Sequence, residues 1–531
     1  MRPPIDFSNF FEREKDAAIS TLTDLVEQQS VTIQQQAEQI QLLKDEIARL
    51  KGQKPKPKIK PSKLEKKPKE DKKTSSGKRA GSQKREKTPE LEIHEHIRIP
   101  PENIPKGSVF KDLQPFTVQG LKIHPHNTCY FLERWQTPDG ANIVGKLPPD
   151  VQSHYDATLK TYILYQHNHC QVTQPLLLEE LREWGVDISA GQLSRILTEQ
   201  KDIFHREKDH ILSAGLRASD YVNVDDTGAR HNGKNGYCTH IGNELFAWFQ
   251  STESKSRINF LELLRTGAAD YVINKDALEY MSNQCLAKSV LHLLENDAKK
   301  LFSDLDQWTV HLQNLKIENH RHIKIATEGA LIGSLLHHGL PKSLVIVSDD
   351  AGQFNIFNHA LCWIHAERTL NKLIAPNEKK RTILDEVRTQ VWDFYKDLKA
   401  YKISPDEAKK IELENRFDVI VGQKTEYQML NLALKRLHEN KSELLLVLER
   451  PEIPLHNNLS ESDIREYVKR RKISGSTRSE MGRRCRDTFT SLKKTCRKLG
   501  ISFWDYLIDR LSNKNAIPPL PEIIVKYANA P

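Results

Sequence analysis

Two pairs of neighbouring aspartates and one glutamate are the side chains whose types and positions could do chemistry. Asp225 and Asp226 end the alternating run YVNVDD, and Asp349 and Asp350 follow the run SLVIVS. Glu461 opens a predicted helix, ESDIREYVKRR, after the breaker-rich PEIPLHNN. Adjacent carboxylates repel one another, and hard cations such as Mg2+ prefer oxygen ligands. Two such ions about 3.5–4 Å apart can activate water and stabilise the leaving oxygen of a phosphodiester.

The alternative interpretation is that these acids are ordinary. A solvated turn explains the aspartate pairs, and an acid near a helix start is favoured by the helix dipole. Neighbouring residues of a strand point to opposite faces. Asp225 lies on the face away from the valines of VNV, which favours Asp225 over Asp226 as the site residue. Asp349 is preferred to Asp350 because it comes sooner after the apolar run.

The elements around these acids predict how they are positioned. YVNVD, YCTHI and LFAWFQ read as three antiparallel strands, with turn formers in ARHNGKNG and at Gly242-Asn243. A helix, SRINFLELLR, follows, SLVIVSD reads as a buried central strand, and FNIFNHALCWIHAERTLNKL reads as helical. This order is expected of a ribonuclease-H-like α/β fold, whose first and fourth strands lie side by side. Asp225 and Asp349 would then face each other, with Glu461 as third carboxylate.

The charge of the chain is concentrated in two blocks. The 531 residues carry a formal net charge of +9, yet residues 51–90 hold 16 Lys and Arg against 5 Asp and Glu, and residues 464–500 hold 13 against 3. Such blocks on an otherwise acidic body predict a polyanionic partner, most simply double-stranded DNA.

The apolar runs are too short for a membrane span, and MRPPIDFSNFFEREKD has no apolar signal core. Neither a membrane location nor export is therefore expected.

The second basic block combines charge with a small-residue loop at Ser474-Gly475-Ser476, which would let the backbone approach a phosphate closely. A solvated helix face is the alternative. The residues predicted to contact DNA here are Arg465, Lys469, Arg470, Arg471 and Arg478.

Residues 153–215 predict short helices, including QPLLLEELREWG and SAGQLSRILTEQ, separated by the turn VDI. This pattern fits a helix-turn-helix that presents Gln192, Ser194 and Arg195 to DNA, although an ordinary helical hairpin would look the same.

The N-terminal part predicts self-association. Residues spaced three and four apart from Ile19 to Leu50 favour a parallel coiled coil, and hence a homodimer or higher oligomer; a single amphipathic helix packed on the body is the alternative. Residues 52–90 are rich in Lys, Pro and Ser and should be disordered.

The seven cysteines are scattered along the chain, which predicts a reducing compartment. Because they lack paired spacing, zinc is not expected.

Four blocks carry a resemblance to a known family. VDDTGARHNGKNG, VSDDAGQF, CWIHAER, and HNNLSE followed by KISGSTRSEMG resemble the catalytic core of the insertion-sequence sixty-six (TnpC-type) DDE transposases. The resemblance covers roughly 150–270 and 343–510, and it implies a catalytic, metal-binding triad of Asp225, Asp349 and Glu461. The supporting or alternative residues that it indicates are Asp226, Asp350, Asn457, Asn458 and His365.

The resemblance implies a bacterial, cytoplasmic and nucleoid-associated enzyme that binds transposon ends, cuts DNA and transfers strands. It would use two Mg2+ or Mn2+ ions per site and could work with accessory proteins of the same element. The alternatives are a catalytically inactive or domesticated DNA-binding protein, or another ribonuclease-H-like nuclease.

Some features depart from the family pattern. Residues 91–152 lack the cysteines of the family's zinc ribbon, and Asp350 stands where relatives tend to have glycine. The predicted domains are a coiled-coil helix (10–51), a disordered basic linker (52–90), a small β-rich region (91–152), a helix-turn-helix-like domain (153–215), a catalytic domain (216–470) with helical insertions near 268–342 and 377–450, and a basic C-terminal helical region (471–531).

Overall fold

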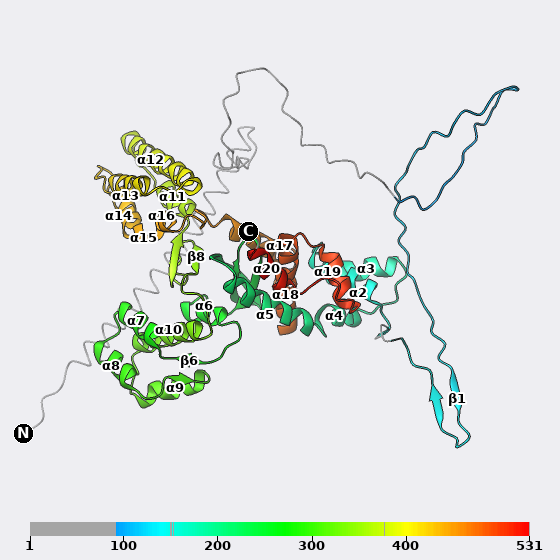
Figure 1. Cartoon of the computed structure of the whole chain (residues 1–531), viewed down its shortest axis with the longest axis horizontal. Helices are drawn as coiled ribbons and strands as arrows, with labels where there is room; N and C mark the ends of the chain where they lie inside the picture. Colours follow the sequence, from blue (N-terminus) through cyan, green and yellow to red (C-terminus); the bar gives the residue numbers. More distant parts are fainter. Residues whose placement is uncertain (1–91, 149–150, 152, 376, 530–531) are drawn as a thin grey trace, which may run out of the picture. The chain divides into compact units, whose positions relative to one another are not determined.

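A computed structural model of the chain describes residues 92–148, 151, 153–375 and 377–529 (Figure 1). The predicted coiled coil and basic linker, over 10–51 and 52–90, lie outside these residues. The chain divides into two units, 1–116 and 117–531. None of the helices in the described ranges is both long and apolar enough to cross a membrane.

The region around 92–148 is poorer in strands than its sequence predicts. In the described part of 91–152, the only strands are β1 (Arg134–Gln136) and β2 (Asn142–Val144), which pair antiparallel. Apolar side chains such as Phe116 and Phe131 remain about nine-tenths exposed, so no core forms that would hold further strands together. The prediction of a small β-rich region is corrected to one short hairpin.

The first helical group follows. It consists of α2 (Ala157–Asn168), α3 (Gln174–Glu183), α4 (Ala190–Thr198) and α5 (Asp202–Arg217). The side chain of Asp156 caps α2, and that of Ser189 caps α4 by accepting from the N–H of Gln192. Buried leucines on α3 and α4 join a common core.

A five-stranded mixed sheet is the centre of the mixed α/β structure. Its strands are β3 (Tyr221–His231), β4 (Lys234–Gly242), β5 (Ala247–Thr252), β8 (Val345–Ser348) and β9 (Asn358–Leu361). Their order is β5-β4-β3-β8-β9, and β4 is antiparallel to both β3 and β5. The later strand β8 lies beside β3 and runs parallel to it, and β9 is parallel to β8.

Two segments differ from their predicted elements. Strand β3 continues past Asp225 to His231, and a tight turn at Asn232 (φ 49°) and Gly233 (φ 77°) leads into β4. The sequence Asn-Gly suits these positive φ angles, so ARHNGKNG is mostly strand. The segment predicted as one helix after Asp349 instead contains strand β9 before its helix begins, because residues 358–361 pair with β8.

Helical segments flank the strands of this sheet (Figure 1). After α6 (Arg257–Leu264), the chain forms β6 (Tyr271–Val272), α7 (Lys275–Asn283), α8 (Lys288–Asn296), β7 (Leu301–Phe302), α9 (Leu305–Asn314) and α10 (His320–His337) before β8. After β9 it forms α11 (Trp363–Asn371), α12 (Glu378–Ile403), α13 (Glu407–Val421), α14 (Gln428–Glu439), α15 (Lys441–Leu444) and α16 (Leu446–Glu449).

The last helices return to the first ones. They are α17 (Asn458–Ser474), α18 (Glu480–Lys498), α19 (Phe503–Leu511) and α20 (Leu520–Ala528). Helix α17 packs on β3 and β4, α18 on β5 and α5, α19 on α2, and α20 on α5. The described parts of 153–215 and 471–531 therefore share one core, although they are remote in sequence.

Candidate active site

Asp225 and Asp349 lie in matching positions on neighbouring strands. The pairing of β3 with β8 runs from Tyr221 opposite Val345 to Asn223 opposite Val347. Continuing that parallel register by two residues brings Asp225 opposite Asp349, just beyond the last paired positions. Both carboxylates therefore lie at the same edge of the sheet, as the order of elements predicts.

The electrostatics of Asp225 show which acids lie around it. Burial is the main cause that raises the pKa of Asp225 to about 7, and the negative charges of Asp349, Asp226 and Glu461 raise it further. The N–H of Asp226, which donates to Asp225 Oδ1 at 2.7 Å, acts in the opposite direction. The two other acids of the predicted triad thus both act electrostatically on Asp225.

The two alternative acids have other partners. Thr239 Oγ1 donates to Asp226 at 2.6 Å and Gln353 Nε2 donates to it at 3.0 Å. These hydrogen bonds oppose the effect of burial, which raises the pKa of Asp226. Asp350 pairs with Arg436 of α14, whose Nη2 lies 2.5 Å from its carboxylate. Asp226 thus joins strand β4 to Gln353 in the loop after β8, and Asp350 joins that loop to α14.

Glu461 lies in the first turn of α17, a helix that begins at Asn458, three residues earlier than its sequence predicts. Its carboxylate is 3.6 Å from His365, 3.4 Å from Arg368 and 3.5 Å from Arg465. Burial and the adjacent Arg368 lower the pKa of His365, against the influence of Glu461 and Asp349. Burial therefore favours the neutral form of His365, which lies beside Glu461.

Asn457 fixes the start of α17 to the sheet. It is buried, its Nδ2 donates to the carbonyl of Val224 at 2.8 Å, and its Oδ1 accepts from Asn223 at 2.9 Å. Its N–H donates to the sulfur of Cys362 at 3.2 Å. These contacts set the distance between β3, which carries Asp225, and α17. Asn458 is the first residue of the helix.

A buried polar group behind Glu461 is absent from the sequence-based prediction. His240, opposite Asp225 in β4, has Nδ1 at 2.6 Å from Ser460 Oγ and Nε2 at 3.2 Å from Asp463. Burial alone would raise the pKa of Asp463, but His240 and the Lys498 ammonium at 2.9 Å hold it below its usual range. Histidine in the strand YCTHI was the available signal, but its partners are remote in sequence.

The donor atoms of the triad suit a hard divalent cation, because they are carboxylate oxygens. Within the ranges that the structure describes, however, no three His, Cys, Asp or Glu side chains are close enough together to form a ligand cage. In this conformation Glu461 is held by cationic side chains instead.

Comparisons with known proteins bear on this arrangement. The model of the Transposase IS66 family matches residues 328–484, which include Asp349 and Glu461. The uncharacterized protein y4jO of Sinorhizobium fredii (strain NBRC 101917 / NGR234) is 43% identical over 321 residues, which are 60% of this chain and all of that protein. The chain belongs to the transposase IS66 family. Asp225 lies outside the residues that the family model matches.

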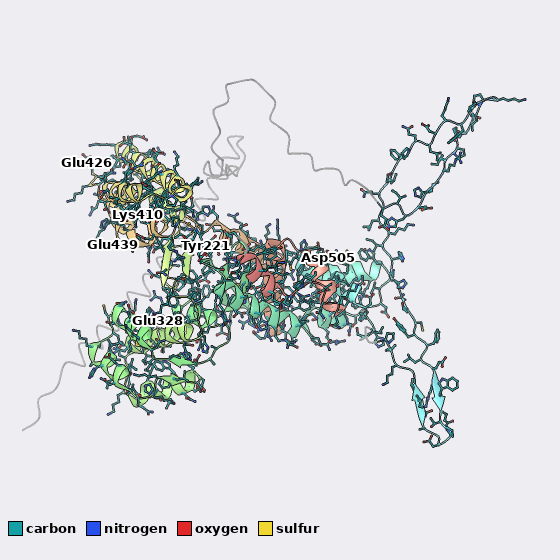
Figure 2. The ribbon with its side chains drawn as sticks, viewed as in Figure 1. Tyr221, Glu328, Lys410, Glu426, Glu439 and Asp505 are labelled. Atoms are coloured by element: carbon teal, nitrogen blue, oxygen red, sulfur yellow. The ribbon has the colours of Figure 1, made fainter. Side chains whose placement is uncertain are left out.

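The loop after Asp349 in this IS66-family chain is also held by Arg257, the first residue of α6. Arg257 donates to the carbonyl of Gly352 at 2.5 Å and to the hydroxyl of Tyr280 at 3.0 Å. Its guanidinium is 3.7 Å from Glu328, a residue of α10 that is 2% exposed and is labelled in Figure 2. Arg257 of α6 and Arg436 of α14 therefore both contact the loop that begins at Asp349.

The predicted DNA-contact residues have different positions in this IS66-family member. Arg465, Lys469 and Arg478 are exposed, and Arg471 donates to the carbonyl of Gly228. Arg470 is buried, with Nη2 at 2.5 Å from His167 Nε2, and its prediction as a DNA contact is corrected. The cause is helical periodicity, since Arg470 lies on the face of α17 that packs inward.

Helices α3 and α4 occupy the predicted helix-turn-helix segments. Leu193, Ile196 and Leu197 bury one face of α4. Arg195 is exposed and donates to Gln192 at 2.5 Å, and Ser194 is half-buried. The outward face is thus polar, as a helical hairpin or a DNA-reading helix would require.

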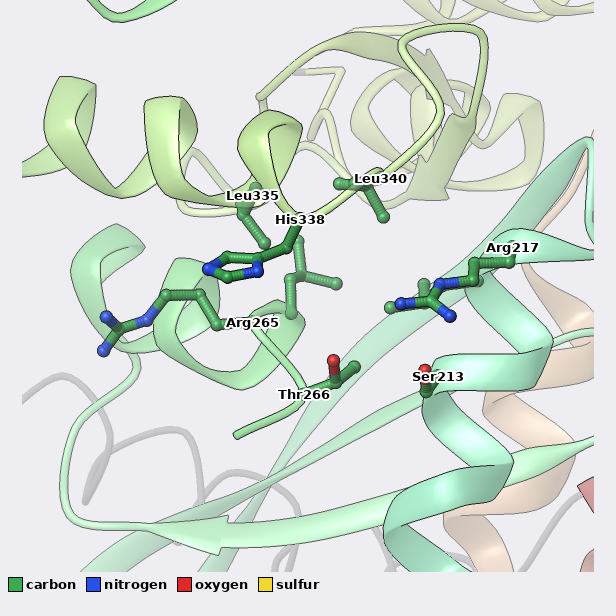
Figure 3. Close-up of a pocket in the computed structure, with 9 residues that line it drawn as sticks. Ser213, Arg217, Arg265, Thr266, Leu335, His338 and Leu340 are labelled. Atoms are coloured by element: carbon green, nitrogen blue, oxygen red, sulfur yellow. The ribbon is translucent and has the colours of Figure 1, made fainter. Parts of the chain in front are cut away.

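Two pockets differ in their relation to the site. Figure 3 shows one lined by Arg217, Thr266, Leu335, His338 and Leu340, among others, and none of the triad residues lines it. The second lies between α11 and α14, and it is adjacent to the candidate site because His365, Cys362 and Asp350 line it.

Replacing Asn457 by alanine should lower the free energy of unfolding by about 1–3 kcal/mol, because Asn223 and the carbonyl of Val224 lose their buried partner. Urea denaturation followed by circular dichroism measures this change. Asn458→Ala, one residue later, is the control and should cost less than about 1 kcal/mol. Equal losses in the two variants would contradict the role given to Asn457.

Proposed function

We propose that this IS66-family chain is a DDE transposase with a ribonuclease-H-like catalytic core. It would bind the double-stranded ends of its mobile element, cut the DNA strand and join the freed 3′-hydroxyl to a target. The observation that carries this proposal is the matching register of Asp225 and Asp349, together with the influence of Glu461 on Asp225.

Asp225, Asp349 and Glu461 would hold two Mg2+ or Mn2+ ions. When bound, these ions would supply the charge that activates water and stabilises the leaving oxygen. For Glu461 to act as a ligand, its oxygens must leave Arg368 and Arg465. Those two guanidiniums would then be free to contact the anionic phosphate backbone.

The remaining features fit the same function. A coiled coil over 10–51 would join two or more protomers, as the pairing of two transposon ends requires, and accessory proteins of the element could assist. Gln192, Ser194 and Arg195 would contact end DNA. We place the protein in the bacterial cytoplasm at the nucleoid, where its DNA substrate lies.

The test uses the purified full-length chain and a labelled duplex that carries the element's terminal sequence. Addition of MgCl2 should produce strand breaks that leave a 3′-hydroxyl, and EDTA should prevent them. A duplex of scrambled sequence is the control. Binding without cutting would favour an inactive DNA-binding protein, and equal cutting of both duplexes would favour another nuclease of the same fold.

A further inference from the structure

The β3–β4 hairpin extends beyond the other strands of the sheet. Strand β8 pairs with β3 only as far as Asn223, and β5 pairs with β4 only from Tyr237 onward. Between Ala229 and Gly236 the hairpin is therefore a two-stranded ribbon. At about 3.4 Å per residue, Arg230 lies roughly 17 Å along the strand from Asp225.

The tip of this ribbon is fixed to the loop after α17. The N–H of Asn232 donates to the carbonyl of Thr477 at 2.9 Å, and the N–H of Thr477 donates to the carbonyl of Arg230 at 3.1 Å. His231 Nδ1 lies 2.9 Å from Thr477 Oγ1. An isolated two-stranded ribbon is marginally stable, so these contacts give the tip a defined position before any ligand arrives.

The ribbon and the loop carry exposed cationic side chains. Arg230 and Lys234 are exposed on the ribbon, Arg478 is exposed on the loop, and Lys472 is exposed in the last turn of α17. In the part of the chain that the structure describes, no carboxylate lies within ion-pair distance of any of them. Glu480, the acid next to this group, pairs with Arg483 at 2.9 Å and lies 3.8 Å from His231 Nε2. Exposed cations without counter-charges on a positioned element favour a polyanionic ligand.

We propose that the hairpin tip, with Arg230 and Lys234, is an arm that contacts the phosphates of duplex DNA beside the cutting position. The arm would contact DNA about five base pairs from Asp225, since base pairs in B-DNA are spaced by about 3.4 Å. Arg478 of the docked loop extends the same surface. This inference rests on the proposed function, because it assigns part of the same substrate to a surface that the DDE site does not include.

The test compares the full-length chain with its Arg230→Gln/Lys234→Gln variant. Binding to a duplex of about 30 base pairs is measured in EDTA over a range of salt concentrations, so cutting plays no part. Each lost phosphate contact should reduce the slope of log K against log salt by about 0.9, giving a reduction of about 1.8 for the variant. Binding should weaken alike for terminal and scrambled sequences.

The control is Lys275→Gln/Lys288→Gln, which removes two exposed charges from α7 and α8 and should leave the slope unchanged. An unchanged slope in the arm variant, with both variants as stable as the native chain, would overturn the arm and favour an acidic protein as its partner. If the slope is unchanged in the arm variant but the native chain cuts DNA, the arm is refuted and the proposed function stands. If the slope falls as expected but the native chain does not cut DNA, only the proposed catalysis is refuted.

Discussion

Asp225→Asn should slow Mg2+-dependent strand cutting about 10³-fold and leave duplex binding intact. Asparagine keeps the size of the side chain and can still accept from the N–H of Asp226. It removes the charge of a carboxylate that we propose as a metal ligand, and a loss of about 4 kcal/mol in transition-state stabilisation would slow cutting about 10³-fold. Asp349→Asn should give the same result. Single-turnover cutting and a gel shift measure the two properties separately.

The matched control is Asp226→Asn, the adjacent residue. Its carboxylate accepts hydrogen bonds from Thr239 and Gln353, and we assign it no metal. Its cutting rate should fall less than about tenfold, a loss below about 1.4 kcal/mol. If Asp226→Asn stopped cutting while Asp225→Asn did not, the assignment of the two acids would be reversed.

Asp225→Asn also has a consequence for stability in EDTA. A carboxyl whose pKa is raised to about 7 in the folded chain binds its proton more tightly there than when unfolded. The free energy of unfolding of the native chain therefore falls as pH rises from about 4 to 7, and the asparagine variant does not show this contribution. The variant should gain stability over the native chain as pH rises through that window. A constant difference between pH 5 and pH 8 would argue against a strongly raised pKa.

Glu207→Ala should lower the free energy of unfolding by about 3–5 kcal/mol. Glu207 is buried on α5, and its carboxylate accepts from both Nε and Nη2 of Arg510 at 3.1 Å. It also accepts from the hydroxyl of Tyr506 at 2.8 Å and from the N–H of Leu520 at 2.9 Å. Removing it leaves a buried guanidinium without its main counter-charge.

Urea unfolding monitored by circular dichroism measures this loss. Glu183→Ala, which removes an exposed acid from α3, is the control and should change stability by less than about 1 kcal/mol. A loss in Glu207→Ala as small as in the control would mean that the C-terminal helices are held to α5 mainly by apolar packing.

The parts of the site that sequence can predict are those with local signals. Alternation in YVNVDD and the apolar run before Asp349 predict the two buried strands that lead to these aspartates, because strand burial is a local property of the sequence. The start of β9 could not be predicted, since its strand conformation depends on pairing with β8. Periodicity places Arg470 on the inward face of α17, but the sequence does not show what covers that face, because its partner His167 is 303 residues away.

Non-local packing also explains why the domain boundaries differ from a linear reading. Nothing local in α5 shows that Glu207 binds Arg510, so 153–215 and 471–531 read as separate regions. The buried group of His240, Ser460 and Asp463 could not be found for the same reason. Each of these residues has an ordinary sequence neighbourhood, and only the folded chain brings them together.

Strand β3 and helix α17 are fastened to each other at two separate points. Asn457 joins them beside the acids, and Thr477 joins them at the hairpin tip. Because both joins connect the same strand to the same helix and the loop that follows it, the tip and the two acids belong to one braced frame. A duplex seated on the hairpin would therefore be aligned with Asp225 and Glu461 by a spacing that is built into the folded chain.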